Sequence, residues 1–120
     1  MAGARGEAVI QTESGEVNAL YTNRALVDIE AATGNNIILH TQNLEHFETG
    51  VTEVAHILRI GMETYRRVKA LGGQLIKMKH ALDVIDELGY LEVANVVMPV
   101  AVKACVNPNA EDDEQEDPNV

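Results

Sequence analysis

Residues 90–108 read YLEVANVVMPVAVKACVNP, an almost wholly apolar stretch with a proline at position 99. If the stretch is helical, Glu92, Asn95, Pro99 and Lys103 fall near one line and about three-quarters of the circumference is apolar. We therefore predict that residues 91–106 form either the central helix of a small bundle or, in part, a self- or partner-binding surface. Pro99 is expected to kink or divide this helix, because proline removes a backbone hydrogen bond and clashes with the preceding turn.

The charge of the chain is concentrated beyond this stretch. Six acidic residues follow it without a basic neighbour: Glu111, Asp112, Asp113, Glu114, Glu116 and Asp117. The formal charge of the chain is −10, so the remainder carries −4. An acidic protein of this kind is a poor candidate for binding nucleic acid or an anionic membrane surface, since Lys and Arg supply most of those affinities. We predict a single domain over residues 1–107 and a flexible, disordered acidic tail over 108–120.

The core and the cellular compartment follow from composition. A chain of 120 residues with one Phe, three Tyr and no Trp must build one modest core from aliphatic side chains. Cys105 is the single cysteine and lies in an apolar setting, which is typical of a buried thiol in a reducing compartment. The first residues lack the pattern of a signal peptide, and residues 91–106 are too short and too polar to span a membrane. We expect a cytoplasmic protein.

The N-terminal third changes from a strand period to a helix period. Residues 6–22, GEAVIQTESGEVNALYT, place β-branched residues on both sides of a Ser14-Gly15 turn signal and alternate in the second arm, which predicts a β-hairpin. Residues 24–33 are rich in helix formers, with Thr22 or Asn23 before them as a cap and Gly34 after them as a stop. Residues 37–42 are ambiguous between an extended piece and a helix, and 41–50 suggest one or two helical turns.

Two amphipathic helices are expected next. The first lies in residues 51–73, is capped by Thr52 and ends at Gly72-Gly73, and the second lies in 74–89 and stops at Gly89. The apolar stripe of the first comprises Val54, Ile57 or Leu58, Gly61 or Met62, Tyr65 and Val68. That of the second comprises Leu75, Met78, Leu82 and Ile85. The predicted fold class is α+β and mainly helical, an N-terminal β-hairpin packed on a bundle of four to five helices.

The chemistry-bearing residues do not form a catalytic or metal-binding pattern. The four histidines, His40, His46, His56 and His80, lack the spacing of a helical zinc site, and there is no cysteine pair for a structural one. A nucleophile built on Cys105 is disfavoured because an apolar setting raises the pKa of a thiol. Asp83, Asp86 and Glu87 fit a solvated helix face better than a calcium loop. We therefore expect no catalytic, cofactor-binding or metal-binding residues, and no enzyme.

Six basic residues flank the Gly72-Gly73 turn: Arg59, Arg66, Arg67, Lys69, Lys77 and Lys79. The favoured interpretation is that they complement the C-terminal end of the first amphipathic helix and otherwise form a solvated edge. The alternative is a contact for an acidic segment, such as the tail of a neighbouring copy.

The order of these features resembles one protein family. The hairpin of residues 6–22 followed by a helix with the pattern Ala-Leu-x-x-Ile-Glu-x-x-Thr-Gly resembles the opening of the small tail assembly chaperones of siphophages and gene transfer agents. The matching residues are Ala25, Leu26, Ile29, Glu30, Thr33 and Gly34. A later Ile-Asp-x-x-Gly pattern at Ile85, Asp86 and Gly89 is similar too, and the resemblance covers residues 4–106. Pro99 and the acidic tail depart from the family.

The resemblance implies a protein without catalysis or cofactor that binds the long, hydrophobic tape-measure protein and helps tail-tube subunits to assemble. It also implies a homo-oligomer in the host cytoplasm that is absent from the finished particle. Two rival classes remain, a small helical regulator of the antitoxin or helix-turn-helix type and a permanent structural tail or connector subunit. The predicted partner-binding residues are Leu91, Val93, Val96, Val97 and Val100.

Overall fold

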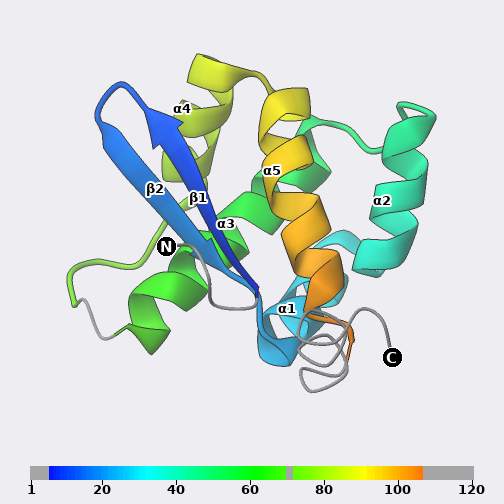
Figure 1. Cartoon of the computed structure of the whole chain (residues 1–120), viewed down its shortest axis with the longest axis horizontal. Helices are drawn as coiled ribbons and strands as arrows, with labels where there is room; N and C mark the ends of the chain where they lie inside the picture. The colour runs from blue at the N-terminus through cyan, green and yellow to red at the C-terminus, as the bar shows by residue number, and fades with distance from the viewer. Residues whose placement is uncertain (1–5, 70–71, 107–120) are drawn as a thin grey trace, which may run out of the picture.

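A short antiparallel hairpin packs against five helices, as expected for a mainly helical α+β fold (Figure 1). The structure is a computed structural model that describes residues 6–69 and 72–106. The elements are β1 (Glu7–Thr12), β2 (Gly15–Leu20), α1 (Asn23–Thr33), α2 (Ile37–Glu45), α3 (Val51–Val68), α4 (Met78–Leu88) and α5 (Tyr90–Lys103). The predicted acidic tail of residues 108–120 lies outside the described residues.

The hairpin forms around a two-residue turn, and in β1 the buried residues Ala8 and Ile10 alternate with less buried ones. Ala8 pairs with Ala19 and Ile10 with Val17, and Gly15 after the turn has a φ of 125° that favours glycine. The inner face, including Ala8, Ile10 and Ala19, is buried against the helices. At the tip of the turn, the Glu13 amide donates a 2.7 Å hydrogen bond to the Glu87 carboxylate on α4.

Helix α1 has the boundaries that the sequence predicts. The Thr22 hydroxyl accepts a 3.1 Å hydrogen bond from the Ala25 amide, and Gly34 adopts the left-handed conformation that ends the helix. The ambiguous segment that follows is helical because Asn36 caps it: its side-chain oxygen accepts a 2.8 Å bond from the Leu39 amide. Of the two alternatives for residues 37–42, the structure thus has the helix and not the extended piece.

The predicted start of α3 is wrong by two residues. Gly50 is the N-cap, with its amide bound by the Glu53 carboxylate at 2.9 Å, so Thr52 lies inside the helix. The buried stripe of α3 includes Thr64, whereas Val68 at its end is exposed, because the helix projects beyond the core there. Thr64 satisfies its own hydroxyl with a 2.7 Å bond to the Ile60 carbonyl.

Helix α4, unlike α3, starts later than predicted, and its buried stripe is shifted. Its first residue is Met78, because the preceding connection is held extended by α3: the Glu63 carboxylate accepts a 2.9 Å bond from the Ile76 amide. Leu75 is consequently outside the helix and 63% exposed. Leu82, predicted to face the core, is exposed instead. The stripe that packs inward comprises Met78, Ala81, Val84, Ile85 and Leu88.

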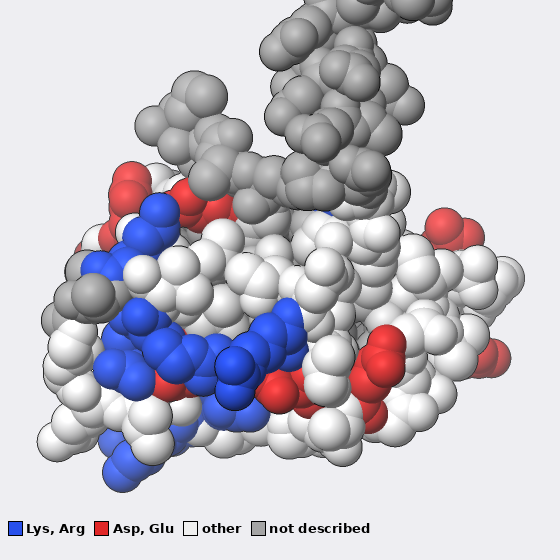
Figure 2. All heavy atoms as spheres, turned by 90° about the horizontal axis from the view of Figure 1, so that it is seen from below, with Lys and Arg blue, Asp and Glu red and all other residues white. Residues whose placement is uncertain are grey.

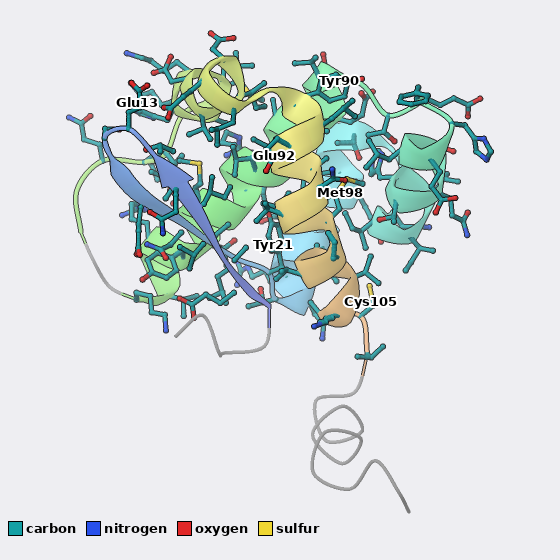
Figure 3. All side chains as sticks on the ribbon, turned by 45° about the horizontal axis from the view of Figure 1, so that its top comes forward. Glu13, Tyr21, Tyr90, Glu92, Met98 and Cys105 are labelled. Carbon is teal, nitrogen blue, oxygen red and sulfur yellow. The ribbon has the colours of Figure 1, made fainter. Side chains whose placement is uncertain are left out.

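Helix α5 is the centre of the fold. It packs against α2, α3, α4 and β1, and its buried residues are Val93, Ala94, Val97, Met98 and Ala101 (Figures 1 and 3). The predicted division at Pro99 does not occur, because one helix continues from Tyr90 to Lys103. Pro99 and Asn95 both face solvent, so water can bind the Asn95 carbonyl, which loses its helical donor.

Candidate interaction surfaces

The predicted partner-binding residues of α5 fall into two groups. Val93 and Val97 are 0% exposed and belong to the core. Val96 and Val100 are half-buried and pack against the core, and Leu91 is 39% exposed. Of the five predicted residues, a partner can thus contact Leu91 and the outer edges of Val96 and Val100 in this conformation. Most of the apolar character of α5 is accounted for by its central position.

A second group of exposed apolar side chains lies on α2, on its connection to α3 and at the first residue of α3, where the sequence analysis placed no site. We call this the α2 surface. It comprises Ile38, Leu39, Phe47 and Val51, all exposed large apolar side chains. The sequence did carry a signal, since once Ile37 and His40 face inward the 3.6-residue period directs Ile38 and Leu39 outward.

Phe47 is the most exposed of these side chains and has an unusual backbone. It is the single Phe of the chain and is 73% exposed. Its φ is 59°, a left-handed conformation that costs a non-glycine residue on the order of 1 kcal/mol. Two hydrogen bonds hold it there: the Phe47 amide donates to the Leu44 carbonyl at 3.0 Å and the Glu48 amide to the Asn43 carbonyl at 2.8 Å. The Phe47 ring is thus exposed to solvent at the end of α2, on a strained backbone that hydrogen bonds hold in place.

A buried polar cluster fixes this end of α2 from beneath. His40 is 1% exposed, and its Nε2 lies 2.7 Å from the Thr33 hydroxyl at the end of α1. The Thr49 hydroxyl donates a 2.7 Å bond to the His40 carbonyl, which ties the α2–α3 connection to α2. Burial lowers the pKa of His40, although the nearby Glu53 carboxylate and the Asn35 carbonyl oppose that effect.

The residues that carry the family resemblance in α1 are mostly structural. Ala25 and Ile29 are 0% exposed, Thr33 joins the buried polar cluster, and Gly34 ends the helix. Glu30 differs, because its side chain is exposed and makes no hydrogen bond or ion pair with the described residues. It lines an open, polar cavity of about 240 Å³ together with Gly34, Asn35 and Asn36.

A second charged feature is the basic surface, which we define as Arg59, Arg66, Arg67, Lys69, Lys77 and Lys79. Figure 2 shows Lys and Arg side chains gathered into a band on the lower face of the molecule. Within the described residues, Arg66 alone in this set forms an ion pair, with Glu63 at 2.6 Å. That pairing, together with the hydrogen bond from Ile76, lowers the pKa of Glu63 to about 2. The Lys69 ammonium lies 5.9 Å from the centre of the Tyr65 ring.

Other kinds of site find little support in residues 6–69 and 72–106. No three His, Cys, Asp or Glu side chains of that region gather as metal ligands, and no helix there has the length and apolar character that a membrane crossing requires. Cys105 is exposed at the end of α5 (Figure 3), and partial burial followed by the charge of Glu30 raises its thiol pKa, which disfavours the reactive thiolate.

Comparisons with protein-family models, with curated proteins and with solved structures find no match to this chain. The function must therefore be argued from its own residues.

Proposed function

We propose that this protein is a phage-type tail assembly chaperone that binds the tape-measure protein reversibly and without catalysis, and so promotes tail-tube assembly. The resemblance of residues 4–106 suggests the client, and the exposed apolar residues suggest how it is held. A long helical client presents apolar side chains along its length, and apolar surface on the chaperone is needed to cover them. The proposed site is the α2 surface, extended by Leu91.

The observation that carries this proposal is Phe47. An aromatic ring held in water by a strained backbone lowers the stability of the isolated protein, so the conformation calls for a function. Aromatic residues dominate the energetics of many protein interfaces because they bury a large area with little loss of side-chain entropy. Other exposed apolar side chains can widen the contact: Ile38 and Leu39 on α2, and Val51 at the start of α3.

Co-expression with a tape-measure protein tests the proposal. Size-exclusion chromatography with light scattering should show a soluble complex of the two. Phe47→Asn keeps a residue that tolerates the left-handed conformation, so it should stay folded while losing most of the complex. Val27→Asn on α1 is the matched control, since Val27 is also exposed and apolar but lies outside the α2 surface. The proposal fails if the tape-measure protein stays insoluble, or if Phe47→Asn retains as much of the complex as wild type and Val27→Asn do.

A polyanion-binding regulator is a second candidate because one observation, the basic surface, favours it. The helices that carry it are separated by residues 69–77, which is longer than the three- to four-residue turn of a helix-turn-helix. Salt-sensitive binding to duplex DNA by the wild-type chain would favour this candidate over the chaperone. High copy number in purified particles would instead favour a structural tail subunit.

A further inference from the structure

Part of the basic surface lies where a positive charge does not stabilise a helix end. Arg66 and Arg67 lie in the last turn of α3, where cations complement the negative end of the helix dipole. Lys77 is the N-cap of α4 and Lys79 is in its first turn, at the positive end of that dipole, and no acidic residue lies in this turn. Complementing helix ends therefore explains Arg66, Arg67 and the C-cap residue Lys69, but not Lys77 and Lys79.

Most of this charge is uncompensated within the described part of the chain. Arg59, Arg67, Lys77 and Lys79 form no ion pair there, and the one paired member, Arg66, is bound by Glu63. Arg59 and Arg66 are seven residues apart and so lie on one side of α3, which extends the surface along the helix. Such a surface fits an anionic ligand with several carboxylates or phosphates spaced along it.

We infer that the acidic segment 111–117 of the same molecule docks on the basic surface. The segment carries six carboxylates and no basic residue. The C-terminal end of α5 and the C-terminal half of α3 lie on the same lower side of the molecule (Figure 1). Val106 is the last described residue, and the chain from Val106 to Asp117 can extend to roughly 37 Å at about 3.4 Å per residue. This reach is comparable with the dimensions of the molecule, which measures 46 × 36 × 27 Å.

The short tether is the reason to assign the contact to one molecule. A linker of a few residues gives the attached segment an effective concentration of about millimolar, which exceeds the concentration of other copies in dilute solution. The docked segment covers the cations and so keeps nucleic acid and other polyanions away from the protein. This gives the excess of acidic residues at the end of the chain a specific role.

Paramagnetic relaxation enhancement tests the contact in the full chain. A nitroxide is attached in the variant Cys105→Ser, Gln115→Cys, which keeps all six carboxylates. Amide signals of residues 59–67 and 77–79 should lose intensity, whereas those of α2 should not. The losses should disappear at an ionic strength of about 1 M, where the Debye length is about 3 Å. Unchanged intensities in α3 and α4 at low salt would overturn the inference.

Two further samples decide the cause and the source of any loss. In the first sample all six acidic residues are changed to Gln or Asn and the nitroxide stays at position 115, and the loss of amide intensity should disappear. A loss that persists would show that charge does not drive the contact. Isotope-labelled chains without nitroxide, mixed with unlabelled chains that carry it, should show no loss. A loss as strong as in the single-species sample would mean that copies exchange tails, which contradicts docking within one molecule.

Substitutions on the basic surface give a matched comparison. Arg67→Gln with Lys79→Gln should weaken the signal losses, because it removes two unpaired cations. Gln42→Glu with Thr52→Glu changes the net charge by the same amount at exposed positions of α2 and α3, and it should leave the losses as they are. If the two double variants weakened the losses equally, the contact would depend on net charge alone, and the assignment to the basic surface would be wrong. The chain with a neutralised tail should also elute from heparin at higher salt than wild type.

Discussion

Tyr21 lies against Gly61 so closely that a side chain at position 61 has no room. A Cβ built on Gly61 would come 2.5 Å from the Tyr21 ring and hydroxyl and 2.9 Å from the Ala19 Cβ. The Tyr21 hydroxyl donates a 2.8 Å hydrogen bond to the Ile57 carbonyl on the same helix, α3. The side chain is 2% exposed, and this burial raises the pKa of its phenol. The pair joins the hairpin to the helix beneath it.

Gly61→Ala is therefore expected to destabilise the protein. Alanine gains about 1 kcal/mol over glycine in a helix interior, but overpacking a buried contact costs about 1–3 kcal/mol. Chemical denaturation followed by circular dichroism should show a lower free energy of unfolding. Thr52→Ala, at an exposed position of the same helix, is the control and should change stability by less than about 0.5 kcal/mol. A stabilised Gly61→Ala variant would contradict the packing of Tyr21 on α3.

Glu63 should make stability depend on acid pH. Its pKa is about 4.5 when unperturbed and about 2 in the fold, mainly because Arg66 donates to it, so the folded state binds fewer protons than the unfolded state. Its stabilising effect is thus present above pH 4.5 and is lost as the pH falls from 4.5 towards 2. Glu63→Gln should lower the free energy of unfolding at pH 7 by about 1–2 kcal/mol.

The measurement for Glu63 is a series of denaturation curves between neutral and acid pH. The difference between wild type and Glu63→Gln should shrink as the pH falls through this window. Glu45→Gln, at an exposed position on α2, should show no such convergence. A difference that stays constant with pH would show that the Arg66 pair does not favour the ionised carboxylate.

His40 should add a second pH dependence nearer neutrality. Burial lowers its pKa below 6.5, so the folded state resists protonation while the unfolded state does not. The stability that depends on neutral His40 is present above pH 6.5 and is lost as the pH falls below that value. His40→Gln should make the melting temperature depend less on pH between pH 7 and about 5. His46→Gln, at an exposed position, should leave that dependence as it is in wild type. An unchanged slope in His40→Gln would rule out this buried histidine as the source.

Substitutions in α5 should separate core from surface. Val97→Asp places an unpaired carboxylate in the core and should unfold the protein, since such a change costs more than about 4 kcal/mol. Leu91→Asp should leave the protein folded, because Leu91 is exposed, and should weaken association with a client if α5 extends the α2 surface. Far-ultraviolet circular dichroism and limited proteolysis report the first effect. A folded Val97→Asp chain of wild-type stability would contradict the central place of α5.

Local signals in the sequence determined much of the fold. Three such signals are properties of neighbouring residues: the period of two in residues 16–21 after the Ser14-Gly15 turn, the end residues Thr22 and Gly34 of α1, and the apolar circumference of residues 91–106. Local hydrogen bonding and burial are enough to express them, so the hairpin, α1 and the central helix were predicted.

Tertiary structure decided the features that depend on residues far apart in the chain. Helix α4 begins at Met78 because Glu63, thirteen residues before Ile76, binds the Ile76 amide, and this leaves Leu75 outside the helix and exposed. Leu82 lies inside α4 on the face that its neighbours do not cover. Phe47 became an exposed, strained residue because the ends of α2 and α3 are fixed by buried partners such as His40 and Thr49. The period of a single helix cannot show which side its neighbours will cover. That depends on how α2, α3, α4 and β1 pack around α5, and this packing separates the core valines of α5 from the surface on α2.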